Sequence, residues 1–157
     1  MKLKFKISPR FPVNPELAKQ VARFCAGLAR PICRMKRLEL PSEIRFNMRR
    51  CGFSRNRSGS AARNRRESFY RIKPVTITLG EGFNSGVHME RQYKYADSPV
   101  CPCDGQTEVY LHLVAHELGH AICGFEANKT GEFQCENFAR HCLEEWRMAT
   151  QDPAAMI

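Results

Sequence analysis

The 157-residue sequence contains no run of apolar residues that approaches the roughly 18 needed for a membrane-spanning helix. The first residues, Met1–Ile7, alternate charged and apolar side chains, and they lack the continuous apolar core of a signal peptide. Internal repeats are absent as well, which argues against a solenoid. We therefore expect a cytoplasmic (intracellular) protein without membrane contact, folded as one domain over residues 1–157.

Acidic residues are scarce in the first hundred positions, where 22 Lys and Arg stand against 7 Asp and Glu. In residues 101–157 the balance reverses, with 3 basic residues against 9 acidic ones. Residues 51–66 are rich in Arg, Gly, Ser and Asn and offer little to bury, so we expect a mobile loop. Alternatively, this basic segment has a function and contacts nucleic acid without sequence specificity. The candidate contact residues are Arg55, Arg57, Arg63, Arg65 and Arg66.

The eight cysteines do not indicate a secreted disulfide scaffold. Such scaffolds are usually shorter than this chain and follow a signal peptide. Cys123, Cys135 and Cys142 fall within expected helices, where cysteine often serves as a small buried apolar residue. We expect reduced thiols.

Apolar periodicity predicts three helices. The first begins at Pro15, which suits a first helical position with Asn14 as its cap, and we expect it to end at Pro31. The second is expected over about residues 107–123, and the third over about residues 131–150.

Alternating apolar and polar residues predict strands at residues 2–7, 44–48, 69–79 and 87–95. The two strands that flank the Arg-rich segment are expected to pair as a hairpin with a long tip. Together the elements predict an α+β domain: an N-terminal helix, a small, mostly antiparallel sheet of about three to four strands, a second helix and a C-terminal helix.

The motif His116-Glu117-x-x-His120 is typical of metal binding by its two histidines. An apolar stripe over residues 111–122 places it on a helix. Two histidines four residues apart lie on one helical face, so both imidazoles can bind one metal ion. Glu117 can then reach a water molecule on that ion and act as its general base.

Residues 132–139 read Glu-Phe-Gln-Cys-Glu-Asn-Phe-Ala. Together with His-Glu-x-x-His, this pattern resembles small zincin metallopeptidases of the gluzincin type. Their second helix reads Glu, then a small residue three on, an acidic or amide residue four on, and Phe-Ala at six and seven. The resemblance covers about residues 107–145 and implies a minimal zincin-like domain. It implies Zn²⁺ bound by the two histidines and Glu132, with Glu136 orienting a ligand histidine.

The chain is also similar in part to SprT-like and phage-type metallopeptidases, through His-Glu-Leu-Gly-His-Ala and the later Gly131–Phe133. The SprT-like family supplies a third histidine just before such a glycine, whereas this chain has Asn, Lys and Thr at positions 128–130. Glu132 is therefore the expected third ligand, and Glu136, followed by Glu126, are the alternatives.

These residues predict a zinc-dependent metallopeptidase that hydrolyses peptide bonds in a protein or peptide substrate, with Glu117 as general base and a zinc-bound water. Tyr93, Tyr95 or His88 could donate to the oxyanion. His112 is expected to be packed or exposed rather than a ligand. One alternative function is a nucleic-acid-binding protein whose zinc site is structural or regulatory, without turnover. Another is metal-dependent hydrolysis of a different amide.

Overall fold

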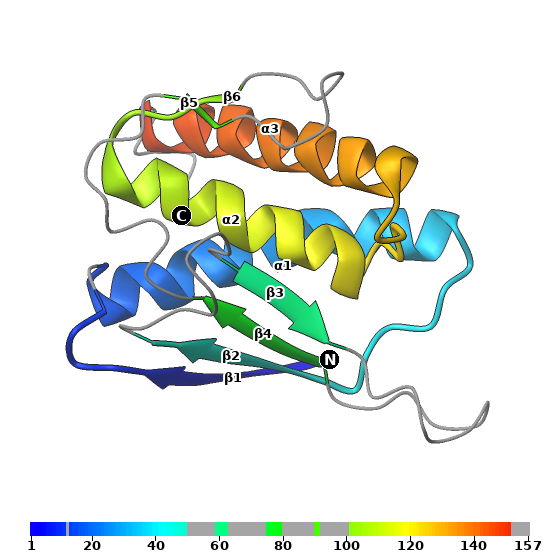
Figure 1. Ribbon diagram of the computed structural model, residues 1–157, viewed down its shortest axis with the longest axis horizontal. Coiled ribbons are helices and arrows are strands. Elements are labelled where there is room, and N and C mark those ends of the chain that lie inside the picture. Colours follow the sequence, from blue (N-terminus) through cyan, green and yellow to red (C-terminus); the bar gives the residue numbers. More distant parts are fainter. Residues whose placement is uncertain (12, 50–58, 63–74, 80–89, 92–100, 152–157) are drawn as a thin grey trace.

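A computed structural model describes residues 1–11, 13–49, 59–62, 75–79, 90–91 and 101–151 (Figure 1). The elements in chain order are β1 (Lys2–Ile7), α1 (Pro15–Met35), β2 (Glu43–Met48), β3 (Gly59–Ala62), β4 (Val75–Leu79), β5 (Glu90–Arg91), β6 (Cys101–Pro102), α2 (Gly105–Ala121) and α3 (Lys129–Gln151). The predicted α+β class, with its three helices, is confirmed.

The main sheet has the strand order β1-β2-β4-β3, in which β1, β2 and β4 are parallel and β3 is antiparallel to β4. The prediction of a mostly antiparallel sheet is therefore wrong. The predicted hairpin is wrong too, because β2 and β4 lie side by side in parallel, with Phe46 opposite Ile77. Parallel neighbours need a long crossover connection, and residues 49–74 supply it.

Part of the segment predicted as a mobile loop forms a strand. β3 lies inside residues 51–66 and pairs with β4 along its whole length. Its sequence, Gly-Ser-Ala-Ala, has no apolar alternation, so only pairing to a distant strand reveals it. Of the strand predicted over residues 87–95, the described part is β5, which pairs with β6 in a separate two-stranded sheet.

Helix α1 begins as predicted and ends later than predicted. The side chain of Asn14 accepts hydrogen bonds from the backbone N–H groups of Glu16 and Leu17, and Pro15 is the first helical residue. Pro31 lies inside the helix and does not end it. The lost backbone hydrogen bond is offset by packing, because Cys33, beyond the proline, is completely buried in the core.

Helices α1 and α2 lie on one face of the main sheet, and α3 covers α2 from the other side (Figure 1). Trp146 of α3 also reaches α1, where its ring meets that of Phe24 edge to face at 5.2 Å. Helix α2 is consequently buried on nearly every side. None of the described helices has the length and apolar character to cross a membrane.

An ion pair joins the start of α2 to the end of α3. The carboxylate of Glu108 accepts two hydrogen bonds from the guanidinium of Arg147, at 2.9 and 2.6 Å, and one from the backbone N–H of Asp104. Burial raises the pKa of Glu108, but these hydrogen bonds outweigh it, so the pKa is lowered from its usual value of 4.5.

We expect Glu108→Gln to lower the free energy of unfolding by about 1 kcal/mol at neutral pH, since Arg147 is partly exposed to solvent. A lowered folded-state pKa means that the stabilisation is present above pH 4.5 and is lost as the pH falls below it. Urea unfolding at several pH values should show the difference between the two proteins shrinking in acid. Glu144→Gln, at an exposed position of α3, is the control. A pH-independent difference would contradict this account.

Candidate metal centre

The two helices that carry the site pack unusually closely at Gly119. A Cβ at this position would lie 2.8 Å from Sγ of Cys135 and 3.2 Å from the ring of Phe125. A side chain at this position would therefore force the Cys135 sulfur and the Phe125 ring to move. The chain then turns at Gly124, whose φ of +66° favours glycine, and leads back into α3.

The three predicted ligand side chains are brought together across this interface. Oε2 of Glu132 lies 3.0 Å from Nε2 of His116 and 3.4 Å from Nε2 of His120. Two atoms bound tetrahedrally to one zinc ion at roughly 2.0–2.1 Å are about 3.3 Å apart. The two separations from Glu132 to the histidines are therefore close to those expected between ligands of one metal ion.

Each histidine is oriented through its other ring nitrogen. Nδ1 of His116 lies 2.8 Å from Oε1 of Glu136, and Nδ1 of His120 lies 2.8 Å from the carbonyl oxygen of Phe125. A carbonyl oxygen only accepts, so Nδ1–H of His120 donates. An ionised carboxylate likewise requires Nδ1–H on His116. Both Nε2 atoms then face Glu132. Metal-binding histidines generally show this arrangement, in which one ring nitrogen donates a hydrogen bond and the other is available to the metal.

Glu136 also reaches a third histidine. Its Oε2 lies 2.9 Å from Nε2 of His112, which is completely buried one turn before His116. Burial alone would raise the pKa of Glu136, but hydrogen bonds from the two histidines lower it to about 2. Burial would lower the pKa of His116, whereas its hydrogen bonds to Glu132 and Glu136 raise it to about 9 in the metal-free chain. Glu136 is thus an ionised bridge between two imidazoles.

Cys135 is a second possible partner for the histidine pair. A ligand atom each of His116, His120 and Cys135 lie within 4.8 Å of one another. Burial, followed by the nearby charges of Glu132 and Glu117, raises the pKa of the Cys135 thiol. Without a metal this sulfur therefore stays protonated, whereas a bound metal ion would favour the thiolate.

Glu117, the predicted general base, is buried beside the same group. Glu117 is 7% exposed. Its negative charge contributes to the raised pKa values of His116 and Cys135. Its charge therefore acts on the histidine and the thiol, and its role as general base stays a prediction.

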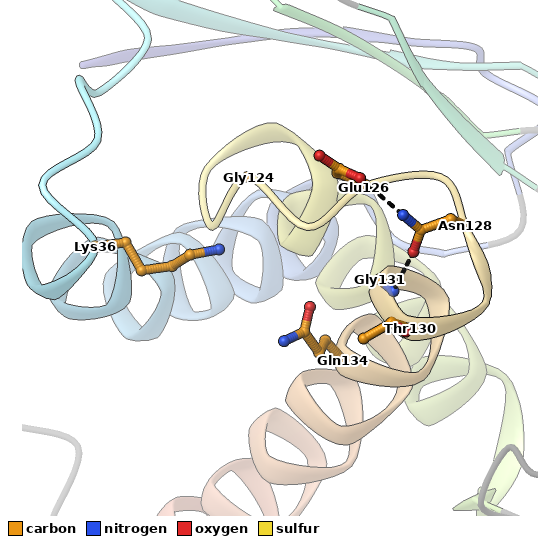
Figure 2. Close-up of a pocket in the computed structure, with 7 residues that line it drawn as sticks. All are labelled: Lys36, Gly124, Glu126, Asn128, Thr130, Gly131 and Gln134. Carbon is orange, nitrogen blue, oxygen red and sulfur yellow. Dashed lines mark hydrogen bonds between the residues drawn. The ribbon is translucent and has the colours of Figure 1, made fainter.

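A polar pocket of about 230 Å³ lies beside the loop that connects α2 to α3 (Figure 2). Its lining residues are Lys36, Gly124, Glu126, Asn128, Thr130, Gly131 and Gln134. Glu126, the most distant ligand alternative, accepts a hydrogen bond from the side chain of Asn128 there. Lys36, from the end of α1, donates to the carbonyl of Cys123 at 2.8 Å, and its Nζ lies 4.6 Å from the ring centroid of Phe125. It thereby holds the segment whose carbonyl orients His120.

The other predicted site residues lie outside the described residues: His88, Tyr93 and Tyr95, and the arginines Arg55, Arg57, Arg63, Arg65 and Arg66. Sequence reasoning missed the role of Lys36, for which no local signal exists. His112 had a signal, because it lies one turn before His116 on the same face and so could share Glu136 with it.

No protein-family model, no curated protein and no solved structure matches this chain.

We expect Lys36→Met to loosen the α2–α3 connection, because it removes one hydrogen bond and one cation–π contact. Amide hydrogen exchange over residues 122–128 should become roughly tenfold faster, while exchange in the main sheet stays unchanged. Lys19→Met, which removes only an exposed pair with Glu16, is the matched control. Equal exchange rates in both variants would mean that Lys36 does not hold the loop.

Proposed function

We propose that the protein is a zinc-dependent metallopeptidase. The proposal is carried by one observation: Oε2 of Glu132 lies 3.0 Å from Nε2 of His116 and 3.4 Å from Nε2 of His120, and Glu117 is buried on the same helix as the histidines. Structural zinc sites usually have four protein ligands, rich in cysteine, whereas catalytic sites have three and keep one position open. Two imidazoles and one carboxylate suit the catalytic class.

When bound, zinc would polarise a substrate carbonyl and lower the pKa of a coordinated water. The residues of the chain supply the rest. Glu117 takes a proton from the attacking water and passes it to the leaving amine. Glu136 and the carbonyl of Phe125 keep the protons of His116 and His120 on Nδ1, so that both Nε2 atoms are available as ligands.

The substrate is proposed to be a protein or peptide in extended conformation. β3 is the outermost strand of the main sheet and is the strand that packs most directly beside α2 (Figure 1). The backbone edge of such a strand can pair with an extended peptide, and this would lay the peptide along the helix that carries His116 and Glu117.

Cys135 supports a second candidate function. If its thiolate joined the two histidines and Glu132, the site would have four protein ligands and no open position. The zinc would then be structural or regulatory, and the basic first hundred residues would make nonspecific nucleic-acid binding the main activity. The distances to Glu132 and the raised pKa of the Cys135 thiol favour the three-ligand site.

Zinc stoichiometry should separate these candidates. We expect about one zinc per chain in wild-type protein, loss of tight binding in Glu132→Ala, and little change in Cys135→Ala. The reverse pattern would favour the four-ligand site that includes Cys135. Wild-type protein that takes up no zinc, even after refolding in its presence, would exclude both candidate functions. Glu144→Ala, on the exposed face of α3, is the control for a lost carboxylate.

Glu117→Gln should keep the zinc and lose hydrolysis, because the amide cannot accept the proton of the attacking water. On an unfolded, fluorescently labelled protein substrate we expect the turnover rate to fall by a factor of about 10²–10⁴. Glu144→Gln, on the exposed face of α3, should behave like wild type. Activity that persists in Glu117→Gln with zinc bound would show that another group is the base.

A further inference from the structure

His112 is a buried histidine to which the proposed reaction assigns no task. It lies on α2 one turn before His116, with no exposure to solvent, and it faces α3. Its Nε2 is 2.9 Å from Oε2 of Glu136, while Oε1 of the same carboxylate is 2.8 Å from Nδ1 of His116. The two oxygens of Glu136 are thus divided between two imidazoles on one helix.

This division decides how firmly Glu136 is held. The residue is 1% exposed, and a carboxylate taken out of water needs polar or charged neighbours at both oxygens to offset the lost solvation. A contact at one oxygen alone would leave the carboxyl group free to rotate about its last bond. Nε2 of His112, at 2.9 Å from Oε2, places a second imidazole against the other oxygen, so the carboxylate is held by close polar contacts on both sides.

A fixed carboxylate in turn fixes the ring of His116. The imidazole can turn about its bond to Cβ, and the direction of Nε2 follows from where Nδ1–H finds its acceptor. Oε1 of Glu136 is that acceptor, and Nε2 then lies 3.0 Å from Oε2 of Glu132. The chain of contacts therefore runs from His112 through Glu136 and His116 to the atoms that would bind the metal.

We propose that His112 is a positioning residue of the metal centre, which acts through Glu136 on the ligand His116. This inference rests on the proposed zinc site. A purely structural contact between α2 and α3 would affect only the stability of the fold. A positioning residue affects the affinity for zinc, and the effect of His112 should depend on the carboxylate of Glu136.

The test is a double-mutant cycle on zinc affinity in the full-length protein. We expect His112→Phe to raise the zinc dissociation constant about 10–100-fold, measured by competition with a chromophoric chelator. In a Glu136→Gln background the same substitution should change it less than about threefold, because a neutral amide does not attract the second imidazole as a carboxylate does. His112→Gln, which retains a donor, should lie between wild type and His112→Phe, and it replaces His112→Phe if the latter does not fold.

Tyr110→Phe is the matched control. Tyr110 is also fully buried on α2, and its hydroxyl donates to the carbonyl of Ala18 at 2.8 Å, away from Glu136. This variant should lower the melting temperature and leave the zinc affinity unchanged. Equal effects of His112→Phe in the two backgrounds, or unchanged affinity in the folded variant, would overturn the proposal while wild-type zinc binding stands. Wild-type protein that binds no zinc would overturn the metal centre itself, and the role of His112 with it.

Discussion

The close approach of α3 to α2 at Gly119 is the constraint on which the candidate metal centre depends. Because no side chain fits between this glycine and Cys135, the two helices are near enough for carboxylates on one to reach imidazoles on the other. Glu132 and Glu136, one turn apart on α3, then meet the histidines of α2 at 2.8–3.4 Å. A wider spacing would separate all of these pairs together, because they share a single interface.

The charges gathered at this interface argue for function rather than for stability. Glu117, Glu132 and Glu136 are all buried. Removing three carboxylates from water costs free energy that two helices packed through apolar side chains would not incur. The neighbouring imidazoles offset part of this cost. A divalent cation would offset more of it, since a metal ion is often the largest charge in such a cluster. Groups of this kind, with displaced pKa values in one place, are typical of active sites.

The helices could be predicted from the sequence because their signals are local. Periodicity and the cap at Asn14 located them, and the resemblance of residues 132–139 to gluzincin metallopeptidases suggested which carboxylate faces the histidines. The sheet could not be predicted in the same way, since strand direction depends on a crossover of many residues and β3 has no apolar pattern. The end of α1 was also missed, because core packing around Cys33 overrides the signal of Pro31. The hydrogen bond from Lys36 to the carbonyl of Cys123 joins residues 87 positions apart, and no sequence motif predicts such a contact.

The long reach of the contacts that support α2 has a consequence for the order in which the molecule can assemble. Tyr110 bonds to a residue 92 positions earlier, and Lys36 to one 87 positions later. Such contacts form only after both partners have been synthesised, so the early helix α1 waits for later segments of the chain. The histidines leave the ribosome before Glu132 and Glu136 do, so a growing chain has an incomplete ligand set until α3 emerges. An enzyme of the proposed kind would stay inactive until the segment that carries α3 has been synthesised.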